Sequence, residues 1–82
     1  MKFDYAKLNG RIREKCQTQA RFAAKMGLSE RSVSFKLNGH RYWTQGDINT
    51  ACEVLDIKPS ELAEYFFTPQ VRYIEQESGG LR

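Results

Sequence analysis

The residues from 18 to 39 read TQARFAAKMGLSERSVSFKLNG, and their spacing is the strongest structural signal in the chain. Phe22 and Met26 lie four residues apart, a spacing that places two apolar side chains on one face of a helix. Gly27 follows, and glycine readily takes the left-handed backbone that ends a helix and lets the chain turn sharply. The pattern predicts a helix over about 19–26.

A second helix is predicted directly after this turn, over about 30–38. Ser29 is placed to accept a hydrogen bond from a backbone N–H of its first turn. Val33 and Leu37 lie about 40° apart around the helix axis and form its inward face. A helix, a glycine-containing turn and a second helix together describe a helix-turn-helix over about residues 18–38.

Helical spacing continues on both sides of this motif. It predicts one helix over about 5–15 and a second that begins after Thr44 and contains Leu55. A third is predicted over about 59–66, where Pro59 suits the first helical position. The connections are short, which favours one compact domain. The expected fold class is therefore all-α, a compact bundle of five helices.

The chain after residue 67 is ambiguous. Residues 71–74 fit either a sixth helical turn or a short β segment, and Ser-Gly-Gly at 78–80 is expected to fray. We therefore assign residues 1–67 to the domain that contains the helix-turn-helix. Residues 68–82 form a C-terminal tail, which is either a dimerisation segment or partly disordered.

Length and composition exclude several classes of protein. The 82 residues suffice for one domain, and 28% charged with 40% hydrophobic residues fits a soluble globule. No apolar run approaches the ~18–20 residues of a membrane span. The N-terminus lacks the apolar stretch of a secretory signal, so we expect a cytoplasmic protein. Cys16, Cys52 and His40 are poorly spaced for zinc, so no metal is expected.

No catalytic constellation is visible either. The sequence lacks a GxSxG motif, a Walker phosphate loop, paired carboxylates in a plausible cleft and a nucleophile with a partnered histidine. We expect neither enzymatic activity nor a cofactor, and no small-molecule ligand is evident.

Charge is distributed unevenly along the chain. Residues 1–46 hold ten basic and three acidic residues, whereas residues 47–82 hold three basic and seven acidic ones. This asymmetry favours one face for a polyanion and another face for a different partner, although chance and a solvated surface give the same pattern.

Residues 18–39 resemble the helix-turn-helix of the phage repressor/Cro superfamily, the lambda-repressor-like domains. The matching positions are Gln19, Ala23, Gly27, Leu28-Ser29, Val33-Ser34 and Asn38-Gly39. The resemblance covers about residues 5–66 and implies a five-helix lambda-repressor-like bundle. Two positions depart from the superfamily's pattern. Lys36 stands where an apolar or aromatic residue is usual, and Phe35 stands where a polar base-reading residue is more common.

The resemblance implies a sequence-specific transcriptional regulator of a phage or prophage, either Cro-like or a repressor. Its helix over about 30–38 would enter the major groove of double-stranded operator DNA. A homodimer would read two half-sites about one helical turn apart. The protein would act in the bacterial cytoplasm, in association with DNA.

The outward face of that helix carries the candidate base-reading residues, which are Glu30, Arg31, Ser34 and Phe35. The Arg31 guanidinium suits the O6 and N7 acceptors of guanine, and its alternative is a solvated arginine. Phe35 either touches thymine methyl groups or packs beside Trp43. The candidate phosphate contacts are Thr18, Gln19, Ser29, Lys36, Asn38, Arg41 and Tyr42. The resemblance implies that Gln19 clamps a phosphate.

The acidic half supplies the candidates for self-association. They are Tyr65, Phe66, Phe67, Val71 and Ile74, unless these apolar side chains complete the monomer core. Trp43 is expected to anchor the core. The alternative function is a protein–protein interaction module, an antitoxin-like or anti-repressor partner that uses the acidic, aromatic C-terminal half.

Overall fold

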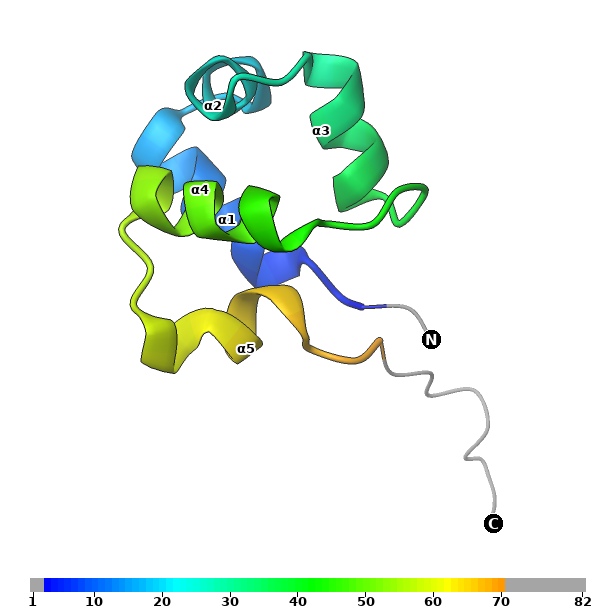
Figure 1. The fold of residues 1–82 in the computed structure, drawn as a ribbon, viewed down its shortest axis with the longest axis vertical. Helices are drawn as coiled ribbons and strands as arrows, with labels where there is room; N and C mark the ends of the chain where they lie inside the picture. Colours follow the sequence, from blue (N-terminus) through cyan, green and yellow to red (C-terminus); the bar gives the residue numbers. More distant parts are fainter. Residues whose placement is uncertain (1–2, 71–82) are drawn as a thin grey trace, which may run out of the picture.

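The structure, a computed structural model, describes residues 3–70. Within this range the chain forms five α-helices (Figure 1), namely α1 (Ala6–Cys16), α2 (Gln19–Met26), α3 (Glu30–Leu37), α4 (Gln45–Leu55) and α5 (Leu62–Phe66). Among the described residues, β pairing is limited to an isolated antiparallel bridge between Phe3 and Pro69. The prediction of an all-α bundle of five helices is confirmed. A bilayer span would need a longer and more apolar helix than any between residues 3 and 70.

Local hydrogen bonds determine where three of the helices begin. The side-chain oxygens of Thr18 and Ser29 each accept a 3.1 Å hydrogen bond from the backbone N–H three residues on. At the start of α4, Thr44 and Asp47 exchange two reciprocal hydrogen bonds of 3.0 Å. Gly27 ends α2 with a left-handed backbone at φ 74°. The helix ends at Gly27, Ser29 and Thr44 lie where the residue pattern predicts them.

The last helix differs from its predicted form. The spacing predicted a helix from residue 59, but Pro59–Glu61 is a 3-10 helix, and the α-helix begins at Leu62. The Glu61 N–H donates to the Lys58 carbonyl at 2.9 Å, which is the tighter, three-residue hydrogen-bond pattern of a 3-10 turn. The helical segment is therefore correctly located, but its first turn is tighter than an α-helix.

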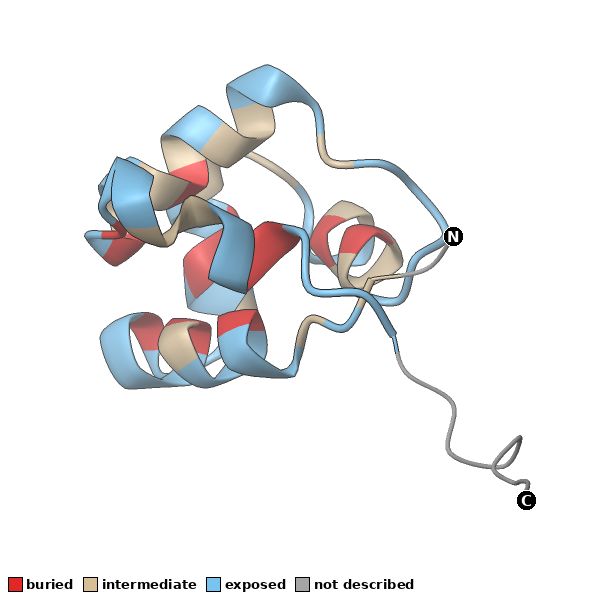
Figure 2. Ribbon diagram, turned by 90° about the horizontal axis from the view of Figure 1, so that it is seen from below, coloured by how far each residue is buried: buried red, intermediate tan, exposed pale blue. Residues whose placement is uncertain are grey.

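The helices enclose one apolar core (Figure 2). Helix α2 packs against α1, α3 and α4, and α5 packs against α1. The buried hydrophobic residues are Leu8, Ile12, Cys16, Phe22, Ala23, Val33, Ala51, Leu55, Ile57, Tyr65 and Phe66. Each fully buried side chain of leucine or phenylalanine size contributes about 1.5–3 kcal/mol. The core therefore holds α2 and α3 in a fixed relation to each other.

The two ends of the described chain lie side by side (Figure 1). The Asp4 N–H donates a 2.7 Å hydrogen bond to the Thr68 carbonyl. The Phe3 ring packs edge-on against Phe67, with 5.7 Å between the ring centroids. Residues 68–70, which the sequence analysis assigned to the tail, therefore lie against the N-terminal segment.

Candidate interaction surface

The outer face of α3 carries an aromatic ring with two guanidinium groups over it. The Cζ atoms of Arg31 and Arg41 lie 5.3 and 5.4 Å from the centroid of the half-buried Phe35 ring. The His40 ring packs edge-on against Phe35 with 6.0 Å between centroids. We call Arg31, Phe35, His40 and Arg41 the Phe35 cluster. Each cation–π contact at an exposed site contributes about 0.5–1 kcal/mol.

The turn after α3 brings His40 and Arg41 onto Phe35. Their backbone N–H groups both donate to the Phe35 carbonyl, at 2.8 and 3.3 Å. Gly39 has a φ of 81°, a left-handed conformation that favours glycine. The structure does not pair the Phe35 ring with the Trp43 ring, whose aromatic neighbours lie outside α3. The cluster is therefore a product of this turn.

Lys36 is not available as a phosphate contact, which corrects the prediction from the sequence. The residue is only 8% exposed. Its Nζ donates to the Tyr42 carbonyl at 2.9 Å and lies 2.8 Å from Asp47 Oδ2. The amine therefore joins α3 to the start of α4 inside the protein.

The Asp47 carboxyl is held in its charged form by these contacts. Burial disfavours the charge, but hydrogen bonds from Lys36 and Thr44 outweigh burial and lower the pKa of Asp47 below its ordinary value of 3.8. One carboxylate thus caps α4 and also neutralises the buried amine.

Several other candidate contacts are already used within the protein. The oxygens of Thr18 and Ser29 cap helices. The Asn38 side-chain amide donates to Ser34 Oγ at 3.3 Å, so a candidate phosphate contact and a candidate base contact are bonded to each other. The remaining candidates at helix starts are the half-buried Gln19 and the exposed Glu30.

Two of the predicted dimer residues belong to the core, which corrects that part of the sequence analysis. Tyr65 is 8% exposed and Phe66 is 1% exposed. They complete the monomer core and do not offer a surface for self-association. Phe67 is 45% exposed. Val71 and Ile74 lie outside the described residues.

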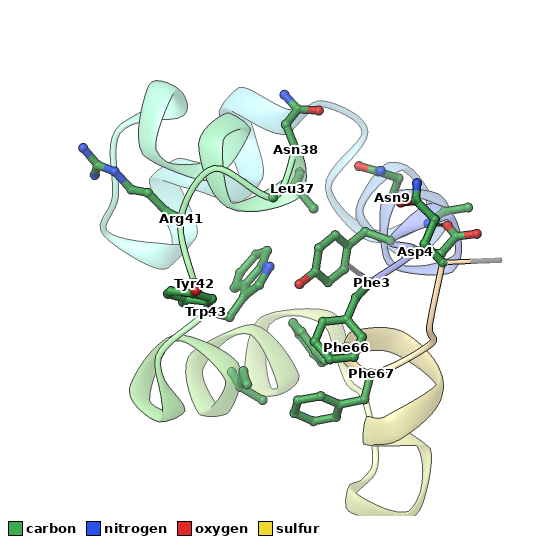
Figure 3. A pocket seen from close by; sticks show the side chains of 15 residues that line it. Phe3, Asp4, Asn9, Leu37, Asn38, Arg41, Tyr42, Trp43, Phe66 and Phe67 are labelled. Carbon is green, nitrogen blue, oxygen red and sulfur yellow. Dashed lines mark hydrogen bonds between the residues drawn. The ribbon is translucent and has the colours of Figure 1, made fainter. Parts of the chain in front are cut away.

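A pocket with aromatic walls includes Arg41 of the Phe35 cluster in its lining (Figure 3). Its volume is about 530 Å³, and its aromatic walls come from Phe3, Tyr5, Trp43, Phe66 and Phe67. Tyr42, which also lines it, is 93% exposed. We call this cavity the aromatic pocket. Sequence reasoning missed it because its walls come from segments that are far apart along the chain.

Comparisons with known proteins give a family and a similar structure. The family described as "Protein of unknown function (DUF739)" matches residues 1–69. The chain is also similar to the solution structure of the modulator of repression (MOR) of the temperate bacteriophage TP901-1 from Lactococcus lactis. The identity is 47%, the TM-score is 0.74, and the match covers 88% of this chain and 97% of that chain. A search of curated proteins returned no match.

This similarity corrects the function predicted from the sequence. We expected a Cro-like or repressor homodimer whose partner is operator DNA. The similar protein is a modulator of repression and not itself a repressor, so the predicted function and the predicted DNA partner and homodimer are wrong. The similarity to a phage protein agrees with the predicted connection to phages, and the family whose model matches is DUF739. The finding favours the alternative, a protein–protein interaction module.

Proposed function

We propose that this chain, which belongs to the family described as protein of unknown function (DUF739), modulates repression in a phage by binding a repressor protein. The observation that carries the proposal is the similarity to the modulator of repression of phage TP901-1. The proposed role is binding, without catalysis. The repressor would keep its operator only while it is not held by this protein.

We assign the repressor contact to the Phe35 cluster. Arginine and large aromatic side chains are enriched among the residues that dominate the energy of protein interfaces. Tyr42 adds an aromatic side chain that is 93% exposed, directly after Arg41 in the chain. The acidic half, which the sequence analysis favoured for this alternative, offers less apolar surface because Tyr65 and Phe66 are buried.

The cluster suits an acidic and partly apolar patch on the repressor. Both guanidinium groups lie over the Phe35 ring, and the N–H donors of a guanidinium match the geometry of a carboxylate. Between residues 3 and 70, neither Arg31 nor Arg41 forms a salt bridge. The excess of basic residues over 1–46 would also steer an acidic partner towards this half of the molecule.

The test combines a binding measurement with a repression assay. The repressor encoded in the same phage genome as this chain, and separately the TP901-1 repressor, are titrated with the purified protein and co-expressed with it beside an operator-controlled reporter. We expect a complex and relief of repression. Phe35→Ala and Arg31→Ala should each weaken binding about tenfold or more. Arg13→Ala, which removes an exposed arginine of α1, should bind like the parent protein.

The possible results distinguish an error in the proposed function from an error in the assigned interface. If neither repressor binds and repression is not relieved, the proposed function is wrong. If a repressor binds the parent protein, Phe35→Ala and Arg31→Ala equally well, the function stands and the interface lies elsewhere.

A further inference from the structure

The aromatic pocket lies where three segments meet: the chain before α1, the turn after α3, and the end of α5 (Figure 3). The Trp43 ring forms part of its wall, with centroids 5.3 Å from Phe66 and 6.2 Å from Tyr5. A volume of about 530 Å³ falls within the range of ~300–1,000 Å³ that ligand-binding clefts have. The cavity is therefore large enough to hold side chains of another molecule.

The walls of this pocket include apolar surface that faces solvent. Phe67 remains 45% exposed although it packs edge-on against Phe3. Exposed aromatic surface in a concave site is stabilised when an apolar group covers it, because that surface then leaves water. The walls thus favour an apolar occupant.

The charged residues of the rim are Asp4 and Arg41. Asp4 Oδ1 accepts a 2.8 Å hydrogen bond from the Ala6 N–H at the start of α1, where the positive end of the helix dipole compensates a carboxylate. Arg41 has no carboxylate partner in the described part of the chain. The Arg41 side chain points away from the cavity, and its guanidinium lies over Phe35 (Figure 3). A positive charge therefore lies beside the pocket, on the side of the Phe35 cluster, and it favours an occupant with an acidic residue at that side.

One polar atom in the pocket wall lacks a partner. The indole Nε1 of Trp43 is buried and donates to no acceptor within residues 3–70. Buried donors without partners are uncommon in folded proteins, and an acceptor that reaches one stabilises the complex. In the described structure this nitrogen is shielded from solvent.

We propose that the aromatic pocket seats apolar side chains of an amphipathic segment of the repressor, and that an acidic residue of this segment pairs with Arg41. The inference rests on the proposed function and deepens it. Arg41 belongs both to the Phe35 cluster and to the pocket rim, so the two surfaces are continuous. In this proposal the segment covers Phe35, its acidic residue pairs with the Arg41 guanidinium there, and its apolar side chains continue into the pocket.

Trp43 makes this proposal measurable, because it is the single tryptophan of the chain. A displayed library of random peptides is selected on the full-length protein, and the enriched peptides are synthesised. We expect peptides with apolar residues and an aspartate or glutamate. Their binding should move Trp43 emission to shorter wavelengths and reduce its quenching by acrylamide, since the occupant displaces water from the pocket.

Two variants alter the pocket without touching the buried core. Phe67→Asp removes an exposed part of the wall, and Asn9→Glu places a longer, negatively charged side chain at the rim on an exposed position of α1. Each should weaken the selected peptides about tenfold or more. Arg13→Glu, a charge change at an exposed position of α1 that is not part of the pocket, should leave their affinity unchanged. Circular dichroism checks that all three variants fold.

Three results would overturn the inference. They are a selection without enriched peptides, enriched peptides that bind both pocket variants like the parent protein, and a Trp43 emission that changes with protein concentration alone, which would place a second copy in the pocket. Titration of the repressor with the pocket variants shows whether only the pocket assignment is wrong or the proposed function as well. A repressor that binds Phe67→Asp and Asn9→Glu normally, but not Phe35→Ala, leaves the function standing without the pocket.

Discussion

The amine of Lys36 lies 2.8 Å from a carboxylate oxygen of Asp47, and this ion pair joins the last turn of α3 to the first turn of α4. The two side chains are only 10% and 17% exposed, so solvent screens the pair weakly. The pair closes the segment between the two helices, which contains His40 and Arg41. The position of the Phe35 cluster thus depends on a contact that is itself hidden from any partner.

Removing the carboxylate of this pair should be costly. Asp47→Ala leaves the buried Lys36 amine without its counter-ion and also removes one of the two hydrogen bonds that cap α4, so we expect a loss of about 2–4 kcal/mol in the free energy of unfolding. Urea denaturation followed by Trp43 fluorescence measures it. Glu53→Ala, at an exposed position of α4, is the control and should stay within about 0.5 kcal/mol.

A double variant tests whether Lys36 and Asp47 stabilise the fold as a pair. Lys36→Met combined with Asp47→Ala should cost less than the sum of the two single changes, because no unpaired charge then remains in the interior. Costs that add within about 0.5 kcal/mol would show that the two side chains stabilise the fold independently.

The same pair should make stability sensitive to acid. The pKa of Asp47 is lower in the folded protein than its ordinary value of 3.8. The folded state therefore gains stability above that value and loses it as the pH falls through the lower, folded pKa. We expect the parent protein to lose stability more steeply than Asp47→Asn below about pH 4. Parallel pH profiles of the two proteins would contradict this account.

The turn after α3 should depend on the backbone freedom of Gly39. At a φ of 81°, an alanine is strained by roughly 1–2 kcal/mol, so Gly39→Ala should lower stability and loosen Arg41 from Phe35. Gly10→Ala is the matched control, since Gly10 lies within α1 and an added Cβ meets no atom within 4 Å. It should raise stability by about 0.5–1 kcal/mol. Thermal unfolding gives the melting temperature of both variants. Equal shifts in melting temperature would show that the left-handed backbone of Gly39 does not stabilise the turn.

Arg11 should stabilise the fold through contacts with the end of α4. Its guanidinium donates to the carbonyls of Leu55 and Asp56 at 2.9 and 3.0 Å, at the end of α4. Arg11→Ala should therefore lower the free energy of unfolding by about 1–2 kcal/mol, because charged donors form the stronger hydrogen bonds. Arg13→Ala, on the same helix but exposed, should change it by less than about 0.5 kcal/mol. Indistinguishable urea midpoints would mean that these carbonyls are equally well solvated without Arg11.

The function shows where reasoning from residues reached its limit. The pair α2 and α3, with its glycine turn, resembled a DNA-binding motif, and the connection to phages that this resemblance implied was correct. The partner was misassigned, because the same pair of helices can present a surface to DNA or to protein. The choice depends on which outer side chains remain free. Here Lys36 is paired internally, and two arginines lie over an aromatic ring.

The elements that could be predicted from the residues alone are those whose causes are local. Thr18, Ser29 and Thr44 cap helices through hydrogen bonds that span three residues, and Gly27 ends α2 through its own backbone angle. Apolar spacing of three and four residues then marks each inward face. These interactions join residues within one or two helical turns of each other, so they can be recognised from the sequence alone.

The tertiary fold decided the contacts between residues that are distant in the chain. Arg11 reaches a carbonyl 44 positions away, Lys36 finds Asp47 on the next helix, and the walls of the aromatic pocket come from both ends of the domain. Tyr65 and Phe66 are buried where α5 packs against α1, and this packing decided between the two roles that the sequence left open for them, core and self-association. Whether each of these side chains forms a hydrogen bond, an ion pair or part of the core depends on which segment the fold packs against it.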